Sequence, residues 1–186
     1  KKATAPIAKS IGINPEQKII LVATDHGVRS ALSWLLPTLA KHIDEKENTG
    51  TQVILKVHPS EDPTLYARFS NNHPWAKVFH KSPDLASLLP FAKCLITCHS
   101  SSNIEALAVG VPVVLLEPDK NSTVRPFMNL ASFGVPSAED AESLSKALRG
   151  LEQGYVAPQK LENIVPWSKS GPAAAAAELC EKFIAE

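Results

Sequence analysis

One stretch in the middle of the chain constrains the fold more than any other, because it joins two buried strands through one short helix. It runs from Lys93 to Pro118 and reads KCLITCHSSSNIEALAVGVPVVLLEP. Apolar runs stand near both ends, at residues 94–97 and 113–116, and each has the length of a buried parallel strand. Gly110 and Pro112 end the helix between them. The stretch predicts a strand–helix–strand unit of an α/β sheet.

Three consecutive serines mark the point where the first of these strands ends. Ser100, Ser101 and Ser102 precede apolar residues at helical spacing, so they occupy the first turn of the helix. A helix start presents unpaired backbone N–H groups and the positive end of the helix dipole, and serine hydroxyls add donors without bulk. The pattern therefore predicts a phosphate-binding turn.

A glutamate lies one turn further along the same helix. Glu105 stands three residues beyond Ser102, about 5 Å along the helix axis, an offset that suits the diol of a ribose. The same spacing is that of a capping box, in which both side chains bond to the helix backbone and no ligand is involved. The spacing alone leaves both interpretations open.

These residues resemble the nucleotide-sugar site of GT-B glycosyltransferases and of the related non-hydrolysing UDP-N-acetylglucosamine 2-epimerases. The matching positions are Ser100, Ser101, Glu105, Ala106, Gly110 and Pro112. The resemblance implies that the serines hold a diphosphate and that the glutamate holds the ribose. The epimerases usually carry two glycines in place of the first two serines and an aspartate in place of Cys98, so the resemblance favours the glycosyltransferases.

A second motif follows an earlier strand. His58 and Pro59 end the apolar run 52–57. They are similar to the His-Pro motif of bacterial sialyltransferases and of teichoic-acid and capsule polymerases, in which the histidine contacts the nucleotide phosphate and pairs with a later Ser-Ser motif. The resemblance implies phosphate binding by His58. The alternative is a histidine that only caps the end of the strand.

Two further positions resemble ligand contacts of the same families. Thr24 and His26 match the Thr-x-His-Arg of the epimerases, with Gly27 in place of the arginine, and Arg29 either replaces that arginine or only begins a helix. Arg125 lies in a loop where nucleotide-sugar enzymes often hold the sugar or the diphosphate. The resemblance implies that Thr24, His26 and Arg125 also contact the ligand.

The rest of the chain alternates strands and helices, which predicts a Rossmann-like, doubly wound parallel α/β sheet of about six strands with right-handed crossovers. By resemblance, this is half of a GT-B fold. Strands are expected at residues 18–23, 52–57, 76–79, 94–97 and 113–116, with a sixth near 133–135. Helices are expected from Val28 through Pro37, over 62–69 and 83–91, from Ser137 to Gly150 and over 173–184. Ligands of such sheets bind beyond the carboxyl ends of the strands, where the loops bring together the hydroxyl, histidine and arginine side chains named above.

We expect three segments. Residues 1–17 form a linker or incoming connection, residues 18–150 form the nucleotide-sugar-binding domain, and residues 151–186 form a connecting segment and a C-terminal helix that packs on the same domain. Met128 is the only methionine and the chain does not begin with one, so we expect a piece of a longer protein. In the GT-B resemblance the acceptor site and often the catalytic base belong to an N-terminal domain, so the catalytic residues stay unassigned. The expected partners are a nucleotide-sugar and that domain.

The charge balance and hydropathy exclude other classes. The 19 basic and 19 acidic side chains cancel, which argues against a nucleic-acid-binding protein. No apolar run approaches the roughly 18 residues of a membrane span, and we expect no signal peptide. We therefore expect a cytoplasmic protein, one that the missing part of the chain could hold at the inner face of the membrane.

The cysteines and acidic residues suggest no metal site. Cys94, Cys98 and Cys180 are odd in number and lack a CxxC pair, and the first two are expected to be small core residues on one face of a strand. Residues 117–119 only loosely imitate a metal-binding Asp-x-Asp, and a helix dipole with hydroxyls can neutralise a diphosphate without a metal. We expect no metal and no cofactor.

Taken together, the motifs predict the donor-binding domain of a bacterial glycosyltransferase of hexosyl or sialyl type that acts in surface polysaccharide synthesis. Its donor would be a UDP- or CMP-sugar. The alternatives are an enzyme like the 2-epimerases and a non-catalytic α/β interaction module, in which the serines would be caps and the histidines incidental.

Overall fold

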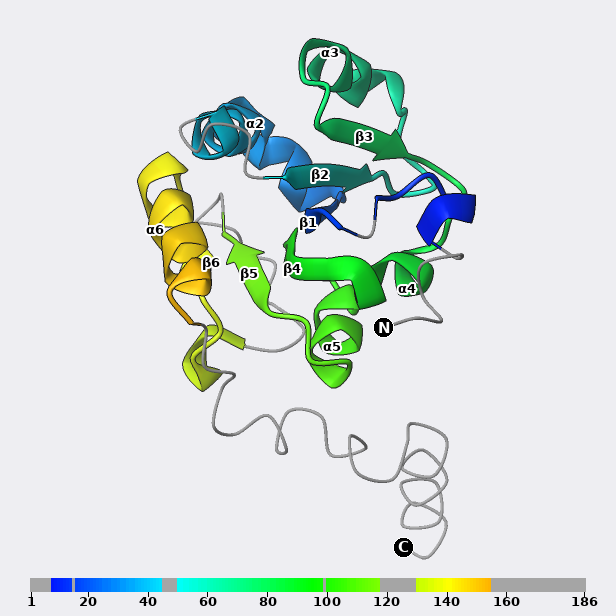
Figure 1. The fold of residues 1–186 in the computed structure, drawn as a ribbon. Helices are drawn as coiled ribbons and strands as arrows, with labels where there is room; N and C mark the ends of the chain where they lie inside the picture. Colours follow the sequence, from blue (N-terminus) through cyan, green and yellow to red (C-terminus); the bar gives the residue numbers. More distant parts are fainter. Residues whose placement is uncertain (1–7, 15, 45–49, 99, 118–129, 155–186) are drawn as a thin grey trace, which may run out of the picture.

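The computed structural model describes residues 8–14, 16–44, 50–98, 100–117 and 130–154. Within these ranges six strands form one parallel sheet in the order β3-β2-β1-β4-β5-β6 (Figure 1). The predicted Rossmann-like α/β fold is confirmed. The strands are β1 (Lys18–Ala23), β2 (Thr51–Lys56), β3 (Ala76–Phe79), β4 (Ala92–Thr97), β5 (Val113–Leu116) and β6 (Ser137–Ala138).

The strand order changes direction at the centre of the sheet. From β1 the chain moves outward to β2 and β3 on one side, and then returns to β4 on the other side of β1. The loops that follow β1 and β4 therefore leave the sheet in opposite directions at the same edge. This topological switch point is where open α/β sheets bind their ligands.

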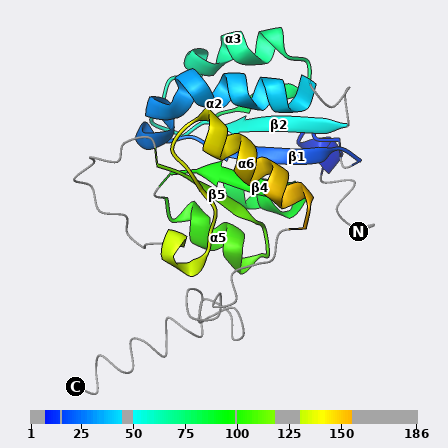
Figure 2. The ribbon, with the colours of Figure 1, turned by 90° about the vertical axis from the view of Figure 1, so that its left-hand side faces the viewer.

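Helices cover both faces of the sheet. One face carries α2 (His26–Asp44), α3 (Thr64–Asn72) and α6 (Ala141–Glu152), and Figure 2 shows α2 and α6 running in front of the strands. The other face carries α4 (Leu85–Leu88), the 3-10 turns η1 (Leu89–Phe91) and η2 (Leu130–Phe133), and α5 (Ser102–Ala108). Side chains alternate between the two cores along the strands, as the pleat requires.

The segment before β1 belongs to the domain. Ala8 and Ile13 are buried in the same core as α5, and the Lys77 ammonium donates to the carbonyl of Gly12. Residues 8–13 of the predicted linker therefore pack against the sheet face that also carries α4 and α5.

Helix α2 begins two residues earlier than its apolar pattern predicts. The carboxylate of Asp25 accepts the N–H of Val28 at 2.8 Å, which caps the helix and lets it begin at His26. The helix continues through Pro37, as predicted. Cys94 and Cys98 are buried beneath it on one face of the sheet, which confirms their expected place in the core.

The sixth strand lies further along the chain than predicted. We expected it near residues 133–135 and expected a helix to start at Ser137. Instead Ser137 and Ala138 form β6 and pair with Leu115 and Leu116. Both expectations were wrong because this two-residue edge strand is defined by its neighbour β5 and not by a pattern of its own.

Helix α6 consequently starts at Ala141. Asp140 forms a capping box with Ser143: the Asp140 carboxylate accepts the Ser143 N–H at 2.8 Å, and the Ser143 hydroxyl accepts the Asp140 N–H at 3.1 Å. The helix runs to Glu152, beyond the expected end at Gly150.

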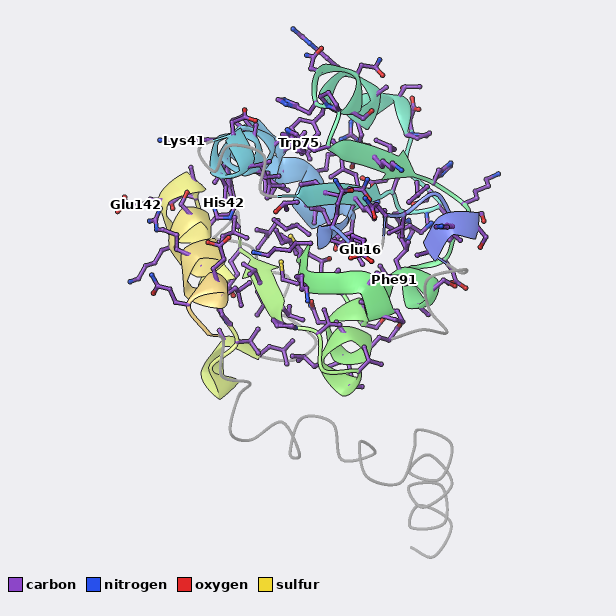
Figure 3. The ribbon with its side chains drawn as sticks, in the orientation of Figure 1. Glu16, Lys41, His42, Trp75, Phe91 and Glu142 are labelled. Carbon is purple, nitrogen blue, oxygen red and sulfur yellow. The ribbon has the colours of Figure 1, made fainter. Side chains whose placement is uncertain are left out.

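The ends of two helices approach each other at the amino edge of the sheet. His42 points from α2 toward α6 (Figure 3), and its Nε2 lies 3.3 Å from Oε1 of Glu152. His42 is therefore at the edge opposite to the switch point, outside the predicted site. Among the described residues, no helix has both the length and the apolar character that a bilayer crossing demands.

Candidate functional site

The predicted site residues lie at the carboxyl ends of three neighbouring strands. Thr24 follows β1, His58 follows β2, and Ser100 to Ser102 follow β4. Because β1 lies between β2 and β4, its loop touches both of the others. The N–H of His58 donates to the Thr24 hydroxyl oxygen at 3.0 Å, and Gly27 packs against Cys98. The fold therefore brings these loops together at the switch point.

Gly27 permits the start of α2 to lie directly against the end of β4. A Cβ atom added to Gly27 would lie 2.8 Å from Sγ and 2.9 Å from Cβ of Cys98, closer than such atoms approach in proteins. The position that carries arginine in the epimerase motif cannot carry a side chain here unless α2 or the end of β4 shifts. Arg29, considered as its replacement, is exposed.

The serine turn is not a capping box. The hydroxyl of Ser102 donates to the Ser100 hydroxyl at 2.7 Å, and the Ser100 oxygen also accepts the N–H of Ser102 at 3.3 Å. Ser101 occupies the N-cap position of α5, but its side chain caps no N–H. The structure thus contains the predicted serine turn and helix without the Ser102–Glu105 cap.

The three hydroxyls differ in exposure. Ser102 is 5 % exposed and supports Ser100, whereas Ser100 is partly exposed and Ser101 is exposed. Glu105 is exposed one turn further along α5. Within the described ranges, neither the Ser101 hydroxyl nor the Glu105 carboxylate has a hydrogen-bond partner. Both groups are open to a ligand at the same end of the helix.

Cys98 is a structural residue of this turn. Its carbonyl accepts the side-chain amide of Asn103 at 2.7 Å, which fixes the exit from β4. Burial raises the pKa of the Cys98 thiol, and the neighbouring carboxylates of Asp25 and Glu117 raise it further. The thiol therefore stays protonated and has no nucleophilic character near neutral pH.

The ring of His58 uses one nitrogen in its own turn, and the other has no partner in the part of the chain that the structure describes. Nδ1 accepts the backbone N–H of Ser60 at 3.2 Å and lies 2.7 Å from the Ser60 hydroxyl. A neutral imidazole whose Nδ1 accepts must carry its proton on Nε2. The side chain is exposed, so His58 presents an N–H donor outward. It caps its turn, as the alternative proposed, and keeps a donor for an anion.

Two residues that the sequence did not single out brace the His58 turn from the β3 side. The ammonium of Lys56, which is 8 % exposed, donates to the carbonyl of His80, and the His80 ring Nε2 lies 3.2 Å from the carbonyl oxygen of Pro59. Burial lowers the pKa of Lys56, and the charge of Asp84 partly opposes this shift. The sequence of β2 does not reveal the burial of Lys56, because a lysine at a strand end is usually solvated.

A buried polar group lies beneath the same turn. Thr24 is 4 % exposed, and its hydroxyl donates to Oε2 of Glu61, while Oε1 of Glu61 accepts the Tyr66 hydroxyl at 3.2 Å. Glu61 is itself 7 % exposed. Sequence reasoning missed Glu61 and Tyr66, because an acid in a polar turn and a tyrosine in a short helix form no distinctive pattern.

The remaining predicted contacts are placed as follows. His26 is the first residue of α2 and is exposed at the switch point. Arg125 lies outside the residues that the structure describes. Within residues 8–14, 16–44, 50–98, 100–117 and 130–154, no three His, Cys, Asp or Glu side chains gather as a metal site would require.

No protein-family model and no curated protein matches the sequence. Solved structures do resemble it. The wall teichoic acid polymerase TagF with CDPG has a TM-score of 0.65 and 15% identity, over 94% of this chain and 41% of that chain. WaaG, a glycosyltransferase involved in lipopolysaccharide biosynthesis, has a TM-score of 0.62 and 15% identity, over 91% of this chain and 47% of that chain.

A third similar structure is that of a Listeria monocytogenes protein described as a UDP-N-acetylglucosamine 2-epimerase. Its TM-score is 0.55 at 16% identity, over 89% of this chain and 42% of that chain. At such identities the likeness establishes the fold, which is the Rossmann-like α/β fold found in these GT-B proteins. The chain spans less than half the length of each of the three.

Proposed function

We propose that this chain is the donor-binding domain of a GT-B glycosyltransferase that acts in bacterial surface polysaccharide synthesis, and that it binds a nucleotide-sugar such as a UDP- or CMP-sugar. One observation carries the proposal. At the switch point, a serine turn whose exposed hydroxyl caps no helix stands on one side of the β1 loop, and a histidine with an outward N–H donor stands on the other.

Each side chain then has a distinct role. Ser100, Ser101 and the Nε2–H of His58 donate hydrogen bonds to the diphosphate, while the Glu105 carboxylate accepts from the ribose hydroxyls. His26 lies at the start of α2, where a cationic or donor ring suits the same anion. Ser102 acts indirectly, because its hydroxyl is buried and fixes that of Ser100.

These donors would assist the departure of the nucleotide. As the bond between the sugar and the diphosphate breaks, negative charge grows on the leaving group, and fixed donors around it lower the energy of that state. His58 serves as a donor and not as a base, because its Nδ1 already accepts within the turn. The base that activates the acceptor would come from another domain of the longer protein.

The similar structures support a longer protein. TagF is a polymerase and WaaG is a glycosyltransferase, and this chain matches less than half of either. An N-terminal acceptor domain would account for the remaining length. We place the whole protein in the cytoplasm, with that missing part as the means by which it reaches the inner face of the membrane.

The 2-epimerases are the second candidate, because one of the similar structures is described as such an enzyme. Two positions count against this function. Gly27 leaves no room for the arginine of the epimerase motif, and Cys98 replaces its aspartate with a buried thiol whose pKa is raised. Nucleotide binding is common to both candidates, whereas interconversion of the sugar would occur only in an epimerase.

A thermal-shift panel of UDP, CDP, CMP and GDP tests the proposal. We expect at least one nucleotide to raise the melting temperature of the wild type. Glu105→Ala should weaken its binding by about 10- to 100-fold, the equivalent of about 1.5–3 kcal/mol for a hydrogen bond to a charged group. Glu142→Ala is the matched control, since Glu142 is also an exposed glutamate in the first turn of a helix, α6.

Two outcomes would count against the proposal. A wild-type protein that responds to no nucleotide would make the chain a non-catalytic module. A response that Glu105→Ala leaves unchanged would remove the ribose assignment but not the phosphate site.

A further inference from the structure

Glu61 is a buried carboxylate with no cationic partner among the described residues. It is 7 % exposed and lies three residues after His58, whose carbonyl accepts the Glu61 N–H at 2.9 Å. A buried carboxylate is costly unless hydrogen bonds satisfy it. Its two oxygens are each served by one hydroxyl, that of Thr24 on Oε2 and that of Tyr66 on Oε1.

This arrangement fixes the direction of the Thr24 hydroxyl. A hydroxyl can donate one hydrogen bond and accept others, and it rotates toward whatever acceptor is near. Because a carboxylate accepts and does not donate, the Thr24 proton must point at Glu61. The lone pairs of the Thr24 oxygen are then left for a donor, and the N–H of His58 takes one of them at 3.0 Å.

The bond between His58 and Thr24 adds one more hydrogen bond between the two chain segments, just beyond the ends of β1 and β2. The last backbone bond between β1 and β2 runs from the Thr24 N–H to the Lys56 carbonyl at 3.0 Å. The next bond of the ladder would join the His58 N–H to the Thr24 carbonyl, but the His58 N–H donates to the Thr24 hydroxyl instead. The Thr24 hydroxyl takes that place, and so sets the direction in which His58 leaves the sheet.

From these contacts we infer that Glu61 is a positioning residue: through the Thr24 hydroxyl it holds the backbone of His58 so that the outward ring N–H meets the anionic part of the ligand. The inference rests on the proposed nucleotide site and changes the role of Thr24 within it. Thr24 acts on the ligand through His58 and not by direct contact, which agrees with its 4 % exposure.

Tyr66 supplies a matched control. Its hydroxyl bonds to the same carboxylate as Thr24, and its side chain is fully buried. Tyr66→Phe therefore removes one hydrogen bond from Glu61, as Thr24→Val does, but leaves the link from Thr24 to His58 in place. A purely structural role for the group predicts similar effects of the two variants on binding.

The test compares Thr24→Val, Thr24→Ser, Tyr66→Phe and Glu61→Gln by calorimetric titration with UDP and CDP. Thr24→Val should weaken binding about 5- to 10-fold, the effect of one lost hydrogen bond, whereas Thr24→Ser restores the hydroxyl and should restore affinity. Tyr66→Phe should change affinity by less than about twofold. Glu61→Gln keeps an oxygen that accepts from Thr24, so it should bind more tightly than Thr24→Val.

A second measurement tests the link between Thr24 and His58 in the absence of a ligand. The backbone amide and ring resonances of His58 should move in Thr24→Val and return in Thr24→Ser, while Tyr66→Phe leaves them in place. If the wild type binds no nucleotide, the proposed function fails and these resonances still decide the positioning role. The inference is overturned if Thr24→Val leaves the His58 resonances unchanged, or if Tyr66→Phe weakens binding as much as Thr24→Val.

Discussion

Gly27→Ala is the most informative single change for the architecture of the site. The new Cβ would lie 2.8 Å from Sγ and 2.9 Å from Cβ of Cys98, and 3.2 Å from Oδ1 of Asp25. Cys98 directly follows β4 and its side chain is buried, so it cannot swing away as a surface side chain would. The start of α2 must therefore move away from β4, or the end of β4 must shift.

Two opposing contributions set the size of the effect. Adding a methyl group to a packed core costs about 1–3 kcal/mol. Alanine in a helix is favoured over glycine by about 0.5–1 kcal/mol, because glycine loses more conformational freedom on folding. The net loss should be about 1–2 kcal/mol, which lowers the melting temperature of a chain of this size by about 2–8 °C.

Urea unfolding followed by circular dichroism measures this loss. Gly150→Ala is the control, because Gly150 is in helix α6 and an added Cβ meets nothing within 4 Å. That variant should gain about 0.5–1 kcal/mol. Adding Cys98→Ala to Gly27→Ala removes the Sγ contact and should recover part of the loss. A Gly27→Ala protein as stable as the wild type would refute the close packing of α2 on β4.

Two further predictions concern stability. Asp140→Ala removes the capping box of α6 and should lower the free energy of unfolding by about 1 kcal/mol, measured by urea unfolding, with Glu142→Ala nearly neutral; equal effects of the two would contradict the capping role. Burial raises the pKa of Cys94 from 9.0 to about 12, so the unfolded thiol ionises at lower pH than the folded one and stability should fall as the pH rises from 9.0 toward 12. Cys94→Ala should flatten that part of the stability–pH curve, and an unchanged slope would show that Cys94 does not cause it.

The strands β1, β3 and β5 lie at the residues expected. The apolar runs of β1 and β5 are buried almost throughout, as in a parallel sheet covered on both faces. The edge strand β3 is only partly buried, but its short run is bounded by turn residues on both sides. The strand β6 was misplaced because Ser137 and Ala138 have no strand pattern and are ordered by pairing with β5. Such an edge strand depends on a partner distant in sequence, which periodicity does not report.

The features of the site, like the strands, divide into those that the sequence could predict and those that it could not. Topology alone brings the ends of β1, β2 and β4 together, so the residue types at that edge could be predicted. The contacts between the loops could not, because the packing of Gly27 on Cys98 and the buried group under His58 join residues far apart in the chain. The inward orientation of Ser102 likewise depends on a neighbour, the Ser100 hydroxyl, and not on its own place in the motif.

Helix α5 is short, and its length determines how the binding of a ligand would affect the rest of the domain. With 7 residues and a left-handed Gly110 at φ 76° just beyond it, the helix has little stability of its own, since isolated helices of fewer than about 12 residues barely form in water. Its packing on β4 and β5 therefore supplies most of the stability that it has. Occupation of the serine turn should therefore slow amide hydrogen exchange along Ile104 to Leu107.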